Sequence, residues 1–410
     1  MGFEYPTAQL VTVANIIMGQ SPPGTTYNEI GEGLPFYQGV TDFGVRSPIR
    51  RVFCTAPTRI AESGDILLSV RAPIGRVNVA TERCAIGRGL AIIRSHEPQN
   101  RTFIEFVLRA KESEWHALEG GGSVFGNAKR DDLESLKIIW PEENIRRYIA
   151  SILGSLDDKI ELNHEMNKTL EQMAHAIFKS WFVDFEPFQD GEFEYNEELG
   201  KEIPKGWVVG IVADLCETQY GYTESASEEK IGPLFLRITD MNKEPWINWS
   251  SVPYCKIDEK HFQKYKLNYG DVLISRMADP GKATIVEHDV EAVFASYLIR
   301  LKTYDIPTSY FLFYYLRSSD FINYAYGTSD DTTRKSMNAK VISSCKLAIP
   351  PAVIINNFYK KIEDMRKQVS INIEESSTLA QIRDALLPKL LSGEIHVNDI
   401  KRDATEEASA

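Results

Sequence analysis

The 410-residue chain lacks the features that mark secreted and membrane proteins. It has no CxxC pair, and an odd, unpatterned cysteine count argues against a disulfide framework and predicts a reducing compartment. The first twenty residues contain no Lys or Arg, and no apolar run approaches membrane-spanning length. We therefore expect a cytoplasmic protein that does not associate with a membrane. The five cysteines are Cys54, Cys84, Cys216, Cys255 and Cys345.

Patterns for catalysis and metal binding are also missing. Gly281-Lys282-Ala283 lacks the leading glycine and the following Ser or Thr of a phosphate-binding loop. The segment that begins at His164 has Lys168 where a zinc protease carries its second histidine. No GxSxG motif occurs, and no Asp/Asn-Pro-Pro-aromatic signature of amino-methylating DNA enzymes. These absences predict a non-catalytic chain with no metal and no cofactor of its own.

A basic net charge is absent too, since the chain carries a formal charge of −12. The acidity is concentrated at residues 142–200, which hold 14 acidic and 5 basic groups. Residues 41–111 hold 12 basic groups, 11 of them Arg, and only 6 acidic ones. A local Arg-rich surface can bind phosphate even when the whole chain is acidic.

What the chain does contain is an internal repeat. The hexapeptide GDILLS at 64–69 returns 206 residues later as GDVLIS at 270–275. Two further segments align in the same order, PFYQGVTD with PLFLRITD and KIIWP with KLAIP, at 35–42 with 233–240 and 137–141 with 346–350. A repeat this long indicates a duplicated domain rather than a solenoid unit. Two similar domains on one chain predict two similar binding events.

Each repeat begins with a segment of β-rich, mixed character. Short apolar runs bounded by Gly, Pro and Asp predict strands, and helical spacing predicts one helix at 102–118 and its equivalent at 309–326. We assign the two domains to residues 1–141 and 207–350. Residues 184–206 form a linker between the repeats, and residues 394–410 form an acidic tail that we expect to be disordered.

Each domain is followed by a predicted long helix, at 142–183 and 351–393. Both segments carry a heptad-like stripe typical of a coiled coil. Asn163 and Asn372 lie on the stripes, where they either fix the register of the pair or face solvent. Pro388 is expected to bend or end the second helix. The stripe residues are Ile149, Leu156, Ile160, Asn163, Leu170, Ile177, Trp181, Phe358, Met365, Val369, Asn372, Leu379, Leu386 and Leu390.

The two long helices can pair with each other in antiparallel orientation. The predicted fold class is therefore α+β, with two similar mixed α/β domains separated by two long antiparallel coiled-coil helices and related by a pseudo-twofold axis. Such an arrangement would place the two domains at opposite ends of a rod.

Polar, Gly-punctuated loops occur at equivalent places in both domains, but their residues differ. Arg and Lys side chains hydrogen-bond guanine and phosphate, Asn and Gln hydrogen-bond adenine, and hydroxyl groups hydrogen-bond phosphate. These loops therefore predict contacts with DNA. The candidates in the first domain are Gln38, Thr41, Arg46, Arg50, Arg51, Arg71, Arg76, Asn78, Ser123, Asn127, Lys129 and Arg130. Those in the second domain are Arg237, Thr239, Arg276, Lys282, Thr328, Ser329, Thr332, Thr333, Arg334 and Lys335.

Over essentially its whole length the chain resembles the specificity subunits of type I restriction-modification systems. The resemblance rests on the repeated motifs above and on IELNHEMNKTLEQMAHAIFKSWFVDFEPF, ELGKEIPKGW and ESSTLAQIRDALLPKLLSGEI. It implies two target-recognition domains that each read half of a split sequence in double-stranded DNA. It also implies long helices that dock two modification (methyltransferase) subunits, to which restriction subunits can add.

The resemblance places S-adenosylmethionine on the modification subunit, in agreement with the missing methylation motif here. The first domain departs from the pattern because it has no entry like the Pro-Lys-Gly-Trp of residues 204–207. One alternative function stays open, a non-catalytic scaffold in a related DNA-modifying defence system.

Overall fold

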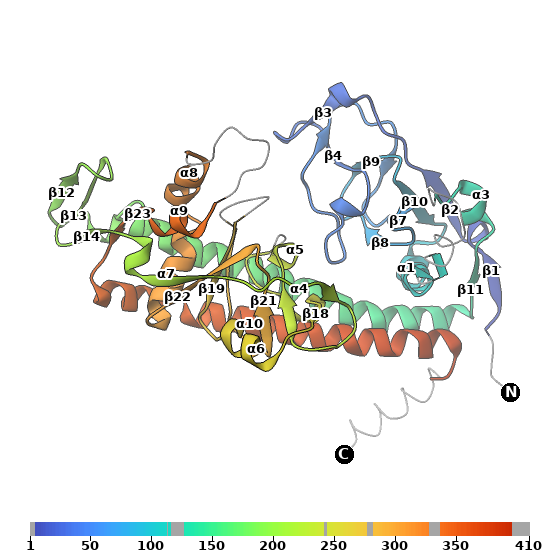
Figure 1. Cartoon of the computed structure of the whole chain (residues 1–410). Coiled ribbons are helices and arrows are strands. Elements are labelled where there is room, and N and C mark those ends of the chain that lie inside the picture. The colour runs from blue at the N-terminus through green and yellow to red at the C-terminus, as the bar shows by residue number, and fades with distance from the viewer. Residues whose placement is uncertain are drawn as a thin grey trace, which may run out of the picture. The chain divides into compact units, whose positions relative to one another are not determined.

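The computed structural model describes residues 5–112, 114–115, 127–241, 244–276, 282–327 and 337–395. The chain forms two compact units, one from residues 1–162 and 375–410 and the other from residues 163–374. Each unit holds one mixed α/β domain together with part of each of two long helices, α4 (Glu143–Phe182) and α10 (Ala352–Ser392) (Figure 1). The duplicated α+β architecture expected from the repeat is confirmed.

The domain of the first unit contains a four-stranded sheet and a five-stranded mixed sheet of shorter strands. The four-stranded sheet has the order β2-β10-β7-β8, and the mixed sheet the order β3-β5-β4-β9-β6, in which β4 and β9 are parallel. A separate pair, β1 and β11, joins the two ends of the domain. The strands are β1 (Thr7–Gln9), β2 (Ala14–Met18), β3 (Tyr27–Asn28), β4 (Leu34–Tyr37), β5 (Phe53–Cys54), β6 (Ile60–Ala61), β7 (Ile66–Ser69), β8 (Val77–Val79), β9 (Cys84–Ile86), β10 (Leu90–Ser95) and β11 (Lys137–Ile139). The helices are α1 (Arg101–Ala110) and α3 (Arg130–Glu134).

The domain of the second unit repeats this topology. Its main sheet has the order β15-β22-β19-β20, its smaller sheet the order β16-β18-β17-β21 with β17 and β21 parallel, and its terminal pair is β14 with β23. The strands are β14 (Val208–Ile211), β15 (Cys216–Tyr220), β16 (Ala226–Ser227), β17 (Leu234–Leu236), β18 (Tyr254–Cys255), β19 (Val272–Ser275), β20 (Ala283–Ile285), β21 (Ala292–Phe294), β22 (Leu298–Thr303) and β23 (Lys346–Ile349). The helices are α5 (Ile238–Met241), α6 (Glu259–Tyr265), α7 (Ile306–Tyr315), α8 (Ser319–Gly327) and α9 (Ala339–Ser343).

The Gly-Asp of the repeated hexapeptide has a structural role in both units. Gly64 and Gly270 have φ values of +90° and +89°, a conformation that glycine adopts readily and other residues rarely. The next residue is a buried aspartate in each case. Asp65 accepts hydrogen bonds from Arg94 on β10, and Asp271 accepts one from Arg300 on β22. The motif therefore ties the start of one central strand to its neighbour.

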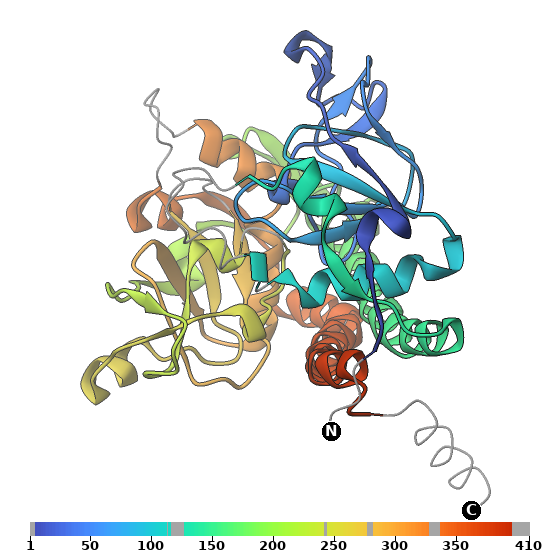
Figure 2. The same cartoon turned by 90° about the vertical axis from the view of Figure 1, so that its right-hand side faces the viewer.

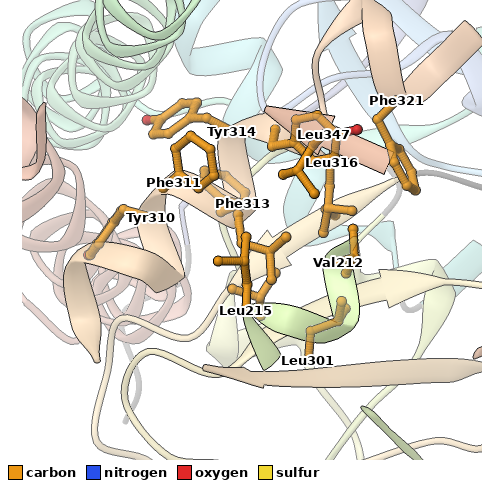
Figure 3. Packing of buried hydrophobic residues seen from close by; sticks show 14 of the residues in the cluster. Val212, Leu215, Leu301, Tyr310, Phe311, Phe313, Tyr314, Leu316, Phe321 and Leu347 are labelled. Atoms are coloured by element: carbon orange, nitrogen blue, oxygen red, sulfur yellow. The ribbon is translucent and has the colours of Figure 1, made fainter. Parts of the chain in front are cut away.

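The helix that follows β10 or β22 covers the main sheet and supplies much of each core. In α1 the buried aromatic residues are Phe103 and Phe106, whereas α7 buries Tyr310, Phe311, Phe313, Tyr314 and Tyr315. Figure 3 shows Tyr310, Phe311, Phe313 and Tyr314 packed with residues of β22, β23 and α8. The core of the second unit is therefore the more aromatic of the two. Each aromatic side chain buries a large area.

Two of the predicted helix bounds need correction. The helix expected at 309–326 is two helices, because the hydroxyl of Ser318 donates to the Tyr315 carbonyl and accepts from the Phe321 amide, which caps the start of α8. The helix expected at 102–118 ends at Ala110 as α1, and residues 116–118 lie outside the described residues.

The two long helices run antiparallel and side by side in both units (Figures 1 and 2). In the first unit Asp157 on α4 pairs with Arg383 on α10 at 2.6 Å. In the second unit Phe178 on α4 contacts Phe358 on α10, with ring centroids 5.7 Å apart. Pro388 does not end α10, which continues to Ser392.

Asparagines fix the register of the helix pair. Asn163, Asn167 and Asn372 are all buried, with side chains 0–2% exposed. Asn372 donates to the Asn167 side chain at 2.8 Å, and Asn167 donates to the Val369 carbonyl at 3.4 Å. Sliding either helix by one turn would break these bonds inside a desolvated contact, so the solvent-facing alternative is wrong.

The buried face of the helices differs in part from the predicted apolar stripe. Asp157, Glu171 and Arg366 are buried charged residues, which an apolar pattern cannot detect. The face is also wider than a two-helix seam because each helix packs against a domain as well as against the other helix. The predicted residues that are buried are Ile149, Ile160, Asn163, Phe358, Val369, Asn372 and Leu390. Those that are only half-buried are Leu156, Leu170, Ile177, Trp181, Met365, Leu379 and Leu386.

A buried ion network joins helices and domain in each unit. In the first unit Asp157 of α4 forms ion pairs with Arg109 of α1 and with Arg383 of α10, both at 2.6 Å. In the second unit the central group is a cation, Arg366 of α10, which pairs with Glu171 of α4 and Glu287 of the domain. The charge at the centre of the contact is therefore reversed between the units.

The segment predicted as a linker, residues 184–206, has regular structure. It contains a hairpin of β12 (Phe193–Asn196) and β13 (Lys201–Pro204). Phe185, Phe188 and Phe193 pack into the core of the second unit, where the Phe185 ring lies 5.3 Å from the ring of Trp207. Residues 396–410 of the predicted tail lie outside the described residues.

Candidate nucleic-acid interface

A tight turn between β9 and β10 gathers several chain segments of the first unit at one place. The turn runs from Gly87 to Leu90, and the Leu90 amide donates to the Gly87 carbonyl at 3.1 Å. The Gly87 amide donates to Tyr37 O, and the Gly89 carbonyl accepts from Val70 N at 2.9 Å. The turn thus holds the ends of β4 and β7 beside it.

The end of β2 lies against the same turn. Gly19 donates to the Leu90 carbonyl at 2.9 Å, and Gln20 donates to the Ile86 carbonyl at 3.1 Å. Gly89 allows the closest approach, because a Cβ added there would lie 2.2 Å from the main-chain oxygen of Gln38. Four strands therefore end at one rigid turn.

The second unit builds the same arrangement bond for bond. Ala295 donates to Leu236 O, Leu298 donates to Ala295 O, and Arg276 donates to Tyr297 O, at 2.9, 2.9 and 3.1 Å. The two hydrogen bonds at the end of β2 also have equivalents. The Gly221 amide donates to the Leu298 carbonyl, and the Tyr222 amide donates to the Phe294 carbonyl. We call this arrangement the turn platform. Its residues are Gln20, Gln38, Arg71, Arg88 and Asn127 in the first unit and Tyr220, Tyr222, Arg237, Arg276, Ser296 and Tyr297 in the second.

The side chains on the two turn platforms differ, while the five main-chain hydrogen bonds described above are shared. Gln38 corresponds to Arg237, and Arg88 corresponds to Ser296. The first platform presents amides and guanidinium groups. The second presents tyrosines, of which Tyr220 is 41% and Tyr297 is 56% exposed, and the Arg276 guanidinium lies 5.1 Å from the Tyr220 ring centroid. Such side chains can bind base edges, stack on bases or contact phosphates.

Several predicted DNA-binding residues of the first unit come together at its turn platform. Arg71 and Asn127 face each other in an isolated antiparallel bridge, and both are exposed. Gln38 is exposed beside Gly89. Thr41 and Lys129 are exposed on the segments that follow Gln38 and Asn127.

Other predicted arginines are exposed but already paired with acidic groups of the chain. Arg50 pairs with Glu82 and Arg51 with Asp42, and both arginines are more than half exposed. Arg76 pairs with Glu112 at 2.8 Å, and Arg130 pairs with Glu134 at 2.6 Å. A phosphate would have to compete with these carboxylates, so the four residues are weaker candidates than Arg71.

Two predicted contacts with DNA are weak candidates because their side chains are largely buried. The Arg46 side chain is only 15% exposed and faces Glu105, Asp157 and Asp158. Burial disfavours its charge, yet these carboxylates raise the pKa of Arg46 above its usual value. Asn78 lies on β8 with 2% exposure and donates to the Val77 carbonyl at 3.2 Å. Both residues stabilise the fold.

Arg59 and Arg88 are two further candidates that the sequence predictions did not include. Both are exposed, and like Arg71 they make no ion pair with any described residue. The Arg59 carbonyl accepts from the Ile86 amide at 2.9 Å, which places its main chain next to the turn platform. The Gly-Arg-Gly at 87–89 was the available signal for Arg88, since glycines on both sides of a basic residue are typical of a close main-chain approach.

The predictions for the second unit are only partly covered by the described residues. Arg237 pairs with Asp240 at 2.9 Å, and Thr239 is exposed next to it. Lys282 is half-buried where β20 begins. Seven predicted residues lie outside the described ranges, namely Ser123, Thr328, Ser329, Thr332, Thr333, Arg334 and Lys335.

Two negative findings apply to the described ranges. No group of three or more His, Cys, Asp or Glu side chains there is arranged to hold a metal ion. No helix in those ranges combines the length and the apolar character needed to cross a membrane.

Known proteins give a consistent family assignment. The model of the type I restriction modification DNA specificity domain matches residues 13–172 and 204–381. The MjaIX specificity subunit of Methanocaldococcus jannaschii is 30% identical over 374 residues, covering 87% of this chain and 83% of the relative. The HindI specificity subunit of Haemophilus influenzae is 25% identical over 342 residues, covering 68% and 73%.

A solved structure shares the fold. The type I restriction-modification S subunit of M. genitalium superimposes with a TM-score of 0.54 at 16% identity, covering 94% of this chain and 96% of that one. The two matched segments of the family model each contain one turn platform and part of the following long helix. This chain belongs to the family of type I restriction-modification DNA specificity subunits.

Proposed function

We propose that this chain selects the DNA sequence for a type I restriction-modification complex. Each turn platform reads one half of a bipartite target in double-stranded DNA. The observation that carries this proposal is the pair of platforms with the same main-chain bonds and different polar side chains. A conserved scaffold with changed side chains is what two different half-sites require.

The long helices are the proposed docking surface for two modification subunits, with restriction subunits added to these. S-adenosylmethionine and methyl transfer belong to the modification subunits, and this chain has no catalytic role and no cofactor of its own. The complex acts on cellular DNA, so we expect it in the cytoplasm. These statements rest on family membership and on the motif absences in the sequence.

The proposal is tested by mapping modified bases in DNA from a host that carries the complete system. We expect one modified sequence with two specified blocks separated by an unspecified spacer. The purified chain supplied with S-adenosylmethionine should transfer no methyl group. A complex that modifies DNA without sequence choice would favour the scaffold function, and methyl transfer by the chain alone would contradict a non-catalytic role.

A further inference from the structure

We propose that Arg88 reads a guanine in the half-site bound by the first unit. This inference rests on the proposed function and assigns one base contact within it. Arg88 occupies the second position of the turn that defines the platform, between Gly87 and Gly89. It is exposed and makes no ion pair with any described residue, in contrast to Arg50, Arg51 and Arg76.

The backbone beneath Arg88 is fixed on all sides. Its own amide donates to the Ser21 hydroxyl at 3.3 Å, and both neighbouring glycines bond to other segments, through Tyr37 and Val70. The two glycines lie so close to Gln38 that an added Cβ would meet its atoms at 3.2 Å and 2.2 Å. A long side chain on an immobile base loses less freedom on binding than one on a mobile loop.

The chemistry of the site favours a base over a phosphate. A guanidinium can donate two parallel hydrogen bonds to O6 and N7 of guanine, which is the commonest specific contact of arginine in the major groove. The platform that carries Arg88 also holds the amides of Gln20, Gln38 and Asn127 beside the guanidinium of Arg71, and all of these groups can bind base edges. A residue that only neutralised phosphate would not need such neighbours.

The second unit gives an internal comparison. Ser296 occupies the position of Arg88, and its amide donates to the Tyr222 carbonyl at 2.8 Å. A hydroxyl on a short side chain has no guanine-specific pattern of donors, so the same turn should give a different preference in the other half-site. The guanine contact is therefore assigned to the first unit alone.

The experiment uses the complete complex with wild-type chain, Arg88→Ala, Arg88→Lys and the control Arg83→Ala. Arg83 is also exposed, at 61% of its side chain, but it pairs with Glu62 at 3.5 Å, one strand away from the turn. Modified sequences are mapped by sequencing, and binding to specific and non-specific DNA is measured at one salt concentration. Thermal midpoints of all four chains check folding.

We expect Arg88→Ala to lose discrimination at one guanine position of one half-site by about tenfold or more, while the other half-site is unchanged. Arg88→Lys should keep its affinity for non-specific DNA but lose the same discrimination, because an ammonium cannot make the bidentate contact. Arg83→Ala should keep the wild-type sequence.

Three results would overturn the assignment while leaving the proposed function intact. Arg88→Ala could weaken specific and non-specific binding equally, with full rescue by Lys, which would make Arg88 a phosphate contact. It could leave both sequence and affinity unchanged, or it could change a position other than guanine. Failure of the proposed function is a separate outcome, in which the wild-type complex itself shows no bipartite sequence.

Discussion

The two units share their main-chain bonds but not the charges by which each domain meets the long helices. The Gly-Asp motif, its arginine partner and the turn platform occur in both units at equivalent positions. At the domain–helix contact, Asp157 is surrounded by arginines in the first unit, whereas Arg366 is surrounded by glutamates in the second. The scaffold has been kept while the sign of the buried charge has been exchanged.

This difference shows which features a repeat must keep. A turn or strand register depends on main-chain geometry, so the residues that fix it recur as visible motifs. A buried ion pair needs only opposite charges. Either partner, the long helix or the residues packed against it, can therefore carry the positive charge. In the second unit the hydroxyl groups of Tyr310 and Tyr314 donate to Glu287 and Glu171 and so complete its network, and burial raises the pKa of both tyrosines.

The largest expected effect comes from removing the central cation of the second unit. Arg366→Met leaves the buried Glu287 with no cation among the described residues and leaves Glu171 with Arg317 alone, which should cost about 3–5 kcal/mol. Arg383→Met in the first unit should cost less, since Asp157 keeps Arg109 and Arg383 is 20% exposed. Hydrogen exchange of α7 and α10, together with denaturant unfolding, would separate the units.

A matched control sharpens this comparison. Adding Glu171→Gln and Glu287→Gln to Arg366→Met removes the unpaired charges and should recover much of the lost free energy of unfolding. Equal losses for Arg366→Met and Arg383→Met would show that the two networks do not differ in the way described.

A smaller difference is expected at the Gly-Asp motif. Asp271→Asn removes the charge opposite Arg300, which is only 9% exposed, and should lower the free energy of unfolding by about 3 kcal/mol. Asp65→Asn acts on Arg94, which is 37% exposed, and should cost about 1 kcal/mol. Denaturant titration of both variants measures the difference. A larger loss for Asp65→Asn would mean that exposure of the arginine does not govern the pair.

The smallest difference between units is expected at the motif glycines. Gly64→Ala and Gly270→Ala both force a Cβ onto a backbone with φ near +90°, at a cost of about 1–2 kcal/mol each. The added atom meets a flexible arginine tip at Gly64 and the Ile306 side chain at Gly270, so the second variant should be slightly worse. Thermal unfolding of the matched pair is the measurement. A stabilised variant at either site would contradict the structural role of the motif.

The sequence predicted the large features because they repeat or are periodic. The duplication followed from GDILLS and GDVLIS, and α4 and α10 followed from a stripe of apolar residues sustained over many turns. A polar residue on an apolar stripe singled out Asn163 and Asn372 but left two roles open, and their burial in the structure excluded exposure to solvent. These signals can be read directly from the order of residues in the chain, so they need no knowledge of the fold.

The features that the sequence did not predict depend on contacts between segments that are distant in the chain. Arg46 was predicted on a DNA-binding loop, but Glu105 and Asp157, which fix it, lie far from it in the sequence. Asp157 and Arg366 resemble surface charges until their partners are placed. Arg88 was missed because the turn platform forms only where four strands end together.

The most direct test of the account is to alter one turn platform at a time and map the modified DNA sequence. Gln38→Ala changes the first unit and Tyr297→Ala the second, and both residues are exposed. We predict that each variant relaxes positions in one half of the bipartite target, that the two halves are different, and that complex assembly is unchanged. If both variants altered the same half, or if neither altered any position, the assignment of one platform to each half-site would be contradicted.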